Sequence, residues 1–328
     1  RVSVTTIGDA TLYLGDCRDV LATLPDQSVQ TCITSPPYFG LRDYGVEGQI
    51  GLEATPAEFV AQMVAVFREV RRVLRDDGTL WLNLGDSYAA QRGGTAMPAE
   101  TLAGGVSGNG CVDAHRGRGS THAHRNASGI GLKHKDLIGI PWRVAFALQS
   151  AGWYLRSDII WSKPNPMPES VTDRPTKAHE YLFLLAKSER YYFDALAFQE
   201  PATGMAPGNR RPTKAAMTGA PEHRTAANLH EIEARETRNR RTVWTVPTHP
   251  FSGAHFATFP PDLIRPCVLA GAPPGGVVLD PFNGAGTTGM VALQEGRRYI
   301  GIELNPEYLH EIAAPRIRAA AAQPRLFA

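Results

Sequence analysis

The segment 275–305 reads GGVVLDPFNGAGTTGMVALQEGRRYIGIELN, and it decides the fold. It begins with a short apolar run typical of a buried strand, passes through a glycine turn and a helix, and ends in a second apolar run. Gly284, Gly286 and Gly289 form a GxGxxG pattern, which lets a backbone turn tightly and approach a ligand closely. Glu303 ends the second strand, where a carboxylate can accept hydrogen bonds from both hydroxyls of a ribose. The segment therefore predicts a site for an adenosine-containing cofactor, and the alternative is a tight turn without a ligand.

Strand and helix patterns alternate along most of the remaining chain. We expect helices at 17–25, 56–75, 141–151, 259–271, 289–296 and 306–322, and strands at 11–16, 28–34, 79–86, 153–163, 180–188, 275–280 and 298–304. This alternation predicts an α/β fold with a doubly wound, mostly parallel sheet. Two polar and basic segments, 89–135 and 200–245, lack an apolar period. We expect one domain over 1–328, with 89–135 as a mobile loop insertion and 200–245 as a second insertion.

Composition excludes several classes of protein. Hydrophobic residues make up 43% of the chain, enough for a buried core, and the net charge of +2 indicates no strong preference for acidic or basic partners. No run approaches about 18 apolar residues, and the N-terminus lacks a signal pattern, so we expect a cytoplasmic protein without membrane contact. The histidines of 89–135 match no ligand spacing and no CxxC pair occurs, so we expect no metal. The four cysteines are widely spread: Cys17, Cys32, Cys111 and Cys267.

A second constellation, Thr34-Ser35-Pro36-Pro37-Tyr38, directly follows the expected strand 28–34. In open α/β sheets, ligands bind beyond the carboxyl ends of the strands. Two prolines fix the backbone there and remove two N–H donors, while Ser35 offers a hydroxyl and Tyr38 a flat ring. This set suits a planar ligand that carries an amino group, with Tyr38 stacked on the ring and Ser35 and a prolyl carbonyl accepting from the amine. The alternative is a proline-rich strand terminator with a surface tyrosine.

Both motifs together resemble the amino-methylating DNA methyltransferases of bacterial and phage modification systems. DPFNGAGTT at 280–288 looks like that family's cofactor motif, DPFxGxGTT, and SPPY at 35–38 looks like its catalytic motif. The segments 255–260 and 74–86 are similar to two further stretches of the family, with Asp76-Asp77 where Pro-Gly is common. The catalytic motif comes first in this chain, as in the permuted group usually called β.

The resemblance implies a Rossmann-like fold, S-adenosylmethionine as the cofactor, and roles for individual residues. Ser35, Pro36, Pro37 and Tyr38 would hold a base flipped out of the duplex. Methyl transfer would be a direct in-line displacement, with no covalent enzyme intermediate. The cofactor-binding set would comprise Asp16, Phe256, Thr258, Phe259, Asp280, Phe282, Gly284, Gly286, Thr287, Glu303 and Asn305. Within it, Asp280 to Thr287 would surround the methionine part, Glu303 the ribose, and Asp16 would lie near the adenine.

Serine at position 35 favours cytosine N4 as the target, because adenine-N6 enzymes of the family more often carry Asp there. Adenine N6 is kept as the alternative. Methylation of cytosine C5 requires a cysteine thiolate as nucleophile. Cys267 lies in an apolar helix pattern and Cys32 in a strand pattern, so both are expected in the core.

Sequence specificity and DNA affinity are expected from the basic insertions and from the loop after the catalytic motif. The resemblance implies double-stranded DNA as the partner, and it is compatible with a cognate restriction endonuclease and with a homodimer. The segment 200–245 is the candidate target-recognition insertion. A solvated charged surface is the alternative for any single arginine. The candidate DNA-contacting residues are Arg42, Arg210, Arg211, Arg238, Arg240 and Arg241.

Three other functions stay open at this point. A methyltransferase for RNA or for a protein glutamine would share the cofactor site, although Ser35 argues against the protein-glutamine class. A catalytically inactive DNA-binding module could keep the fold. A nicotinamide oxidoreductase would share the glycine turn, but it needs further strands after that turn, and 23 residues follow Asn305.

Overall fold

The structure is a computed structural model that describes residues 2–89, 131–202, 237–248 and 258–323. In its first part lie β1 (Ser3–Ile7), β2 (Ala10–Leu14), α1 (Cys17–Thr23), β3 (Val29–Thr34), α2 (Pro56–Val73) and β4 (Leu74–Leu84). These are followed by α3 (Ile140–Ser150), β5 (Tyr154–Ser162), β6 (His179–Ala186), β7 (Glu200–Pro201), β8 (Thr237–Arg238) and β9 (Val243–Thr245). The last part holds α5 (Pro261–Gly271), β10 (Val277–Asp280), α6 (Thr287–Gln294), β11 (Arg298–Glu303), the π-helical η3 (Tyr308–Ala313) and α7 (Ala314–Ala321).

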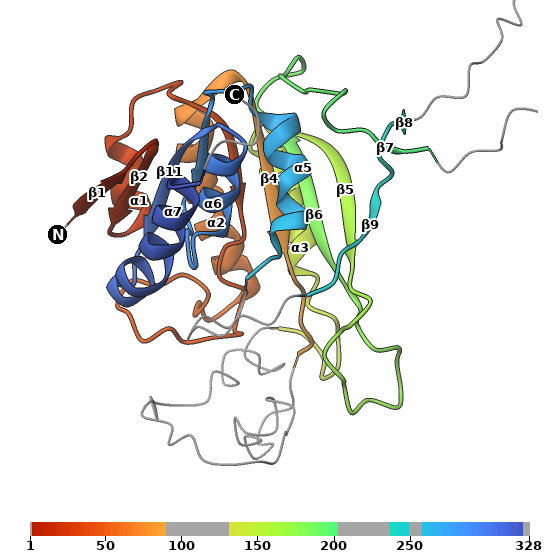
Figure 1. Cartoon of the computed structure of the whole chain (residues 1–328). Coiled ribbons are helices and arrows are strands. Elements are labelled where there is room, and N and C mark those ends of the chain that lie inside the picture. The colour runs from red at the N-terminus through yellow and green to blue at the C-terminus, as the bar shows by residue number, and fades with distance from the viewer. Residues whose placement is uncertain (1, 90–130, 203–236, 249–257, 324–328) are drawn as a thin grey trace, which may run out of the picture.

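One nine-stranded sheet forms the centre of the described chain, in the order β1-β2-β11-β10-β3-β4-β6-β5-β9 (Figure 1). The five neighbours from β2 to β4 all run parallel. At one edge β1 pairs antiparallel with β2. Toward the other edge β6 runs antiparallel to both β4 and β5, and the edge strand β9 runs parallel to β5. The prediction of a mostly parallel α/β sheet is confirmed.

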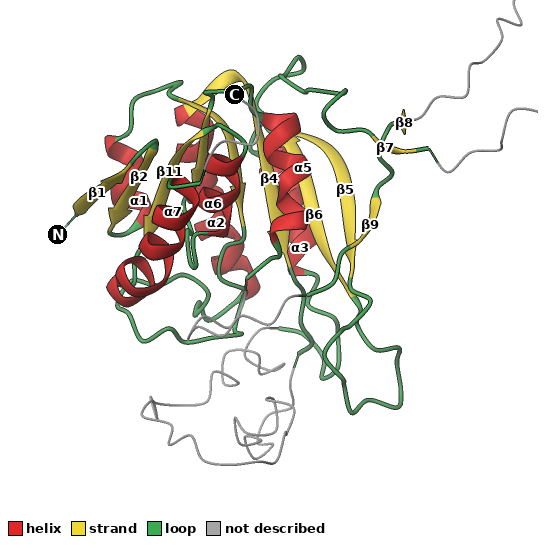
Figure 2. Cartoon of the chain, in the orientation of Figure 1, coloured by secondary structure: helices red, strands yellow, loops and turns green. Residues whose placement is uncertain are grey.

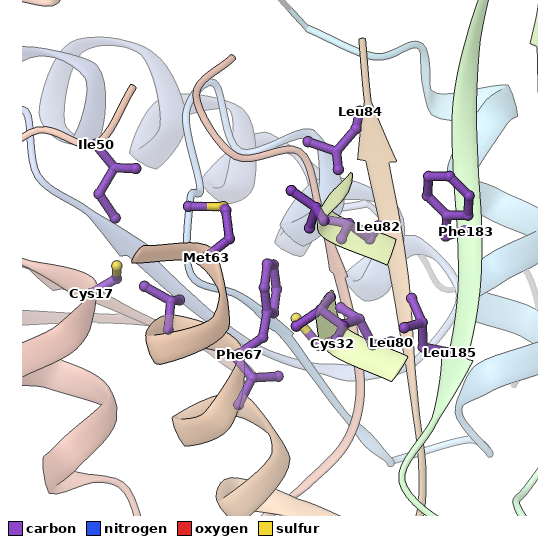
Figure 3. Packing of buried hydrophobic residues seen from close by; sticks show 14 of the residues in the cluster. Cys17, Cys32, Ile50, Met63, Phe67, Leu80, Leu82, Leu84, Phe183 and Leu185 are labelled. Atoms are coloured by element: carbon purple, nitrogen blue, oxygen red, sulfur yellow. The ribbon is translucent and has the colours of Figure 1, made fainter. Parts of the chain in front are cut away.

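Helices cover both faces of this sheet (Figure 2). Side chains alternate along each strand, so neighbouring residues enter opposite layers. Cys32 and Leu80 face α1, α2 and α3, whereas Ile33 and Trp81 face α5, α6 and α7. Figure 3 shows the first of these layers, in which Met63 and Phe67 of α2 pack toward β3 and β4. Burial on both faces explains why the central strands are continuously apolar.

Helix α2 shows how local sequence sets an element and where the expectation was wrong. Thr55 caps the helix in a reciprocal capping box with Glu58, and Pro56 occupies the first turn. We expected the helix to reach residue 75 and Asp76-Asp77-Gly78 to end it. Instead the helix ends at Val73 and β4 begins at Leu74. Val29 pairs with Leu74 and the register then shifts before Thr31, so a bulge absorbs the polar residues.

Other boundaries also differ from the expectation. The strand β1 was not expected; only Ile7 of its five residues is buried, so it lacks the apolar alternation that marks a strand. The expected helix 306–322 divides into η3 and α7. Pro315 has no N–H to continue an α-helical ladder, and the wider π-helical turns lie directly before it.

For each of the two expected insertions, the two ends lie next to each other in the structure. Backbone hydrogen bonds join Ala89 N to Asp136 O (2.9 Å) and Lys135 N to Ala89 O (3.0 Å), so the ends of 89–135 adjoin. The pairing of β7 with β8 likewise brings Glu200 beside Arg238. Residues 90–130 and 203–236 themselves lie outside the described residues. Among the described helices, none has the length and apolar character needed to cross a membrane.

Candidate active site

The two motifs meet at the carboxyl edge of the parallel strands. The catalytic turn 35–38 follows β3, and the glycine turn 281–286 follows β10, which is the strand next to β3 in the sheet. Glu303 ends β11, on the other side of β10. Thr34, the last residue of β3, donates a hydrogen bond from Oγ1 to Asp280 Oδ1 at 2.6 Å. Residues 246 positions apart in the chain are thereby joined directly.

Asp280 is the residue that ties these turns together. It is 2% exposed, and besides Thr34 it accepts bonds from Thr288 Oγ1 (2.7 Å) and from the Phe282 amide (3.0 Å). Burial raises the pKa of Asp280 to about 6, against the lowering effect of these three donors. The Asp280 side chain therefore links Phe282, in the glycine turn, to Thr34, which directly precedes the catalytic turn. Its expected contact with a methionine moiety stays a prediction.

The glycine turn packs tightly against neighbouring elements. Gly284 and Gly286 adopt positive φ angles of 49° and 72°. A Cβ atom on Gly286 would lie 3.1 Å from both Ala313 Cβ and Ile317 Cδ1, so this glycine permits contact with η3 and α7. A Cβ on Gly289 would lie 2.5 Å from the ring of Tyr299 on β11. Gly286 and Gly289 thus allow close packing around the turn. Thr287, the residue after the turn, accepts a hydrogen bond on Oγ1 from Arg316.

Glu303 lies beside the glycine turn, as expected for a ribose-binding carboxylate. Its Oε2 accepts from the Gly284 amide at 2.7 Å, and its Oε1 accepts from the Asn305 amide at 2.9 Å. Burial raises the pKa of Glu303 to about 7, although those two amides act in the opposite direction. Each carboxylate oxygen keeps a further lone pair for a hydroxyl donor. The donor set of an adenosine ribose therefore fits this carboxylate.

Asp16 and two tyrosines surround the end of β11. The Gly15 amide donates to Glu303 O at 2.8 Å, which places Asp16 next to this strand end. Burial acts to raise the pKa of Asp16, but the hydrogen bonds and charge of Arg18 outweigh it and lower the pKa. Tyr44 and Tyr308 meet edge to face with ring centroids 6.2 Å apart. Burial raises the pKa of both phenols, and the Glu303 charge raises it further. The sequence did not predict Tyr308 here, because no motif spans it.

On the catalytic turn, Tyr38 is half-buried and its hydroxyl points away from the glycine motif. It donates to Glu180 Oε2 at 2.6 Å and lies 3.2 Å from Asn83 Oδ1. Burial, together with the Glu180 charge, raises the Tyr38 pKa well above its usual value, so the phenol stays protonated. Pro36 is buried, while Ser35 and Pro37 are partly exposed. Neither Glu180 nor Asn83 was predicted, because both are distant from Tyr38 in the sequence and only the order of the strands in the sheet brings them to it.

The cysteines of the described chain are core residues. Cys17, Cys32 and Cys267 are free and buried, and burial raises the pKa of each thiol, to about 12 for Cys17. The expectation that Cys32 and Cys267 pack in the core is confirmed. A thiol with so high a pKa is a poor nucleophile at neutral pH. Within the residues that the structure describes, no cluster of three or more His, Cys, Asp or Glu could hold a metal ion.

The candidate DNA-contacting arginines fall into different environments. Arg238 Nε donates to Glu200 Oε1 at 2.8 Å, and the Arg240 guanidinium lies 5.4 Å from the Trp244 ring centroid. Arg241 is exposed, and Arg42 lies in the loop that follows the catalytic turn. Thr258 and Phe259 are partly exposed just before α5. The predicted DNA-contacting residues Arg210 and Arg211 lie outside the described residues, as does Phe256, which was predicted to bind the cofactor.

Comparison with a protein-family model and with curated proteins points to one class of enzyme. The model of a DNA methylase family, the N6/N4 methyltransferases, matches residues 29–314. A Type II methyltransferase of Citrobacter freundii, M.Cfr9I, is 49% identical over 312 residues, which cover 95% of this chain and 89% of that protein. M.SmaI of Serratia marcescens is 46% identical and covers 90% of this chain and 87% of its own length.

Solved structures share the fold at lower sequence identity. The cytosine-N4-specific PvuII DNA methyltransferase matches with a TM-score of 0.60 and 17% identity, covering 99% of this chain and 92% of that one. A DNA modification methylase of Thermus thermophilus, in complex with S-adenosyl-L-methionine, matches with a TM-score of 0.56 and 24% identity. That match covers 95% of each chain. At these identities the likeness establishes the architecture of the sheet and its helices.

Proposed function

This chain belongs to the DNA methylase family of N6- and N4-directed methyltransferases, and from that premise we propose that it methylates the N4 amino group of cytosine in double-stranded DNA. Family membership makes it an S-adenosylmethionine-dependent DNA methyltransferase that acts on an exocyclic amino group. The observation that carries the proposal is the position of Ser35-Pro36-Pro37-Tyr38 at the end of β3. There the turn adjoins Asp280, and β10 alone separates its strand from that of Glu303.

S-adenosylmethionine supplies a methyl group on a positively charged sulfur, an electrophile that an amine can attack. In this chain, Glu303 would accept hydrogen bonds from the ribose hydroxyls, and its negative charge would favour a cationic ligand. Asp16 and the tyrosine pair Tyr44–Tyr308 would bound the adenosine on the side of β2 and η3. Aromatic edges and a carboxylate at one strand end are suited to a nucleoside.

The catalytic turn would hold the target base. The Tyr38 ring offers a stacking surface, and Ser35 Oγ and the Pro36 carbonyl can accept the two amino protons of cytosine. Accepting these protons turns the nitrogen lone pair out of conjugation and toward the methyl group. In this transfer the C–N bond would form as the C–S bond breaks, the electron pair of the broken bond would stay on sulfur, and the amino nitrogen would then give up one proton to water. Reaching this turn requires the base to leave the helix, at a cost of roughly a few kcal/mol that stacking offsets.

Ser35 also underlies the choice of base. The preference for cytosine rests on the resemblance, because adenine-N6 enzymes of the family more often carry Asp at this position. Adenine N6 is the alternative within the same family. Methylation at C5 lacks support in the described chain, because its cysteines are buried and their thiol pKa values are raised.

Assignments for the rest of the molecule belong to the same proposal. The 49% identical relatives bear the name Type II methyltransferase, which supports a place for this chain in a restriction-modification system with a cognate endonuclease. We propose that the segment 200–245 recognises the target sequence and that the segment 89–135 contacts DNA. The enzyme acts as one catalytic domain, alone or as a homodimer.

The test separates duplex DNA from other methyl acceptors. Methyl-labelled S-adenosylmethionine is offered with unmethylated duplex DNA, with RNA and with a protein extract rich in glutamine. Label should enter duplex DNA alone, and Tyr38→Ala should abolish that label while its affinity for the cofactor stays unchanged. Label in RNA or protein at a rate equal to that in DNA would contradict the proposal, as would a fully active Tyr38→Ala enzyme.

A further inference from the structure

Behind the catalytic turn, Asn83 of β4 and Glu180 of β6 reach the Tyr38 hydroxyl, and Lys163 in turn reaches Glu180. The bond to Glu180 Oε2 on β6 is 2.6 Å long, and Asn83 of β4 is oriented by its own bond to Tyr181 O at 3.1 Å. Lys163, just past the end of β5, forms an ion pair with the other oxygen of Glu180. The Glu180 and Lys163 side chains are 16% and 18% exposed. The Glu180 carboxylate, which accepts the hydrogen bond from Tyr38, is therefore largely shielded from water.

Lys163 is itself held in place from two sides. Its ammonium lies 4.3 Å from the centroid of the Trp161 ring, and its backbone amide donates to Ala178 O at 2.8 Å. Because Trp161 pairs with Glu180 across the two strands, the lysine and the glutamate approach each other by register alone. The pair is thus fixed by the sheet, and the pair in turn fixes the hydroxyl end of Tyr38.

The ring of Tyr38 is restrained by the backbone as well. A Cβ atom on Gly85 would lie 2.4 Å from Tyr38 Cε2, so the ring occupies space that only a glycine leaves open. Gly85 directly follows β4, the strand that carries Asn83. Contact at the ring and a charge-assisted bond at the hydroxyl together remove both torsional freedoms of the side chain.

We propose that Glu180, held by Lys163, is a positioning residue for methyl transfer: it fixes the plane of Tyr38 on which the target base stacks. This inference rests on the proposed function of Tyr38. A stacked base presents its amino group to the methyl group only if the ring plane is fixed, and a misplacement of about 1 Å can slow a reaction about a hundredfold. In this role Glu180 acts through its hydrogen bond with the tyrosine hydroxyl.

A double-mutant cycle tests this coupling in the full-length enzyme. The variants are Tyr38→Phe, which removes only the hydroxyl, Glu180→Ala, and the two combined. Single-turnover methyl transfer to duplex DNA should fall about tenfold to a hundredfold in each single variant. The double variant should be no slower than the slower single one, because both changes break the same bond. Glu180→Gln, which keeps an acceptor oxygen, should restore part of the rate.

Cofactor affinity and a matched ion pair separate positioning from general destabilisation. The dissociation constant for S-adenosylmethionine should be the same in the wild type and in all four variants, so that only the transfer rate changes. Glu295→Ala removes the ion pair between Glu295, directly after α6, and Arg265 of α5, and it should lower thermal stability without slowing transfer. A wild-type rate in Glu180→Ala, or rate losses that multiply in the double variant, would overturn the inference. If Tyr38→Ala also keeps the wild-type rate, the proposed function itself fails.

Discussion

Among single residues, we expect Glu303 to give cofactor binding a pH dependence near neutrality. Its pKa is raised to about 7 by burial, and ribose hydroxyls and a cationic ligand both favour the ionised form. The affinity for S-adenosylmethionine should therefore be full above pH 7 and fall as the pH drops through that value. Calorimetry should show a dissociation constant about tenfold larger at pH 6 than at pH 8.

The matching control for this prediction is Glu303→Gln. Its side chain cannot ionise, so its weaker binding should lose most of the dependence between pH 6 and pH 8. A wild-type dissociation constant that stays constant over this range would show that Glu303 does not hold the cofactor in its charged form.

Residues within the two motifs could be predicted from sequence because they are consecutive. The turn at 35–38 and the glycine turn each carry their chemistry in a few neighbouring positions. Glu180 and Tyr308 could not be predicted in this way. Glu180 reaches Tyr38 through the order of the strands, and Tyr308 of η3 meets Tyr44 of a loop that is distant in the sequence. Asp280 was predicted near the cofactor, and its bonds to Thr34 and Thr288 add a role that sequence spacing cannot reveal.

At the scale of elements, the turn between β10 and α6 depends on Gly286. The residue combines a φ of 72° with close contact to Ala313 and Ile317. Gly296, at the other end of α6, has a similar φ of 71° but no atom within 4 Å of an added Cβ. Alanine at either site carries the left-handed backbone cost of roughly 1–2 kcal/mol. Alanine at 286 must also push Ala313 of η3 and Ile317 of α7 slightly away.

We therefore expect Gly286→Ala to destabilise the cofactor-free protein more than Gly296→Ala, by about 1 kcal/mol or more. Denaturant unfolding of the two variants and the wild type measures the difference. Equal losses of stability would mean that α7 shifts freely and that the turn is not braced by it.

Helices with strong caps were predicted closely, whereas edges and bulges were not. The capping box and the apolar spacing of α2 fixed its start, but nothing local distinguishes Arg75-Asp76-Asp77 as strand rather than turn. Pairing of Val29 with Leu74 decides that point through a contact between distant residues. The exposed edge strand β1 escaped prediction for a similar reason, since its pairing with β2 rather than burial holds it.

For the molecule as a whole, DNA binding should depend on exposed rather than paired arginines. Arg238 and Arg240 are engaged with Glu200 and Trp244, whereas Arg241 is exposed. Arg241→Ala should weaken DNA binding and reduce the slope of log Kd against log salt by about 1. Arg75→Ala is the control, because Arg75 is exposed at the opposite end of β4 from the catalytic turn. An equal change of slope in both variants would place the DNA elsewhere.

The order of the strands is the feature of the whole molecule that the sequence could not supply. Alternating strands and helices predicted the class of fold, but the position of β6 between β4 and β5 follows from packing. That position brings Glu180 to Tyr38, and the pairing of β11 with β2 brings Gly15 and Asp16 to Glu303. The site is thus assembled from both ends of the chain.

The most direct test of the central claim is nucleoside mass spectrometry of unmethylated genomic DNA after incubation with the enzyme and S-adenosylmethionine. N4-methylcytosine should appear with the wild-type enzyme and be absent with Tyr38→Ala. N6-methyladenine in its place would contradict the assignment of the base from Ser35. If neither base is methylated by an enzyme that binds its cofactor, the account of a DNA amino-methyltransferase site at the ends of β3 and β10 is wrong.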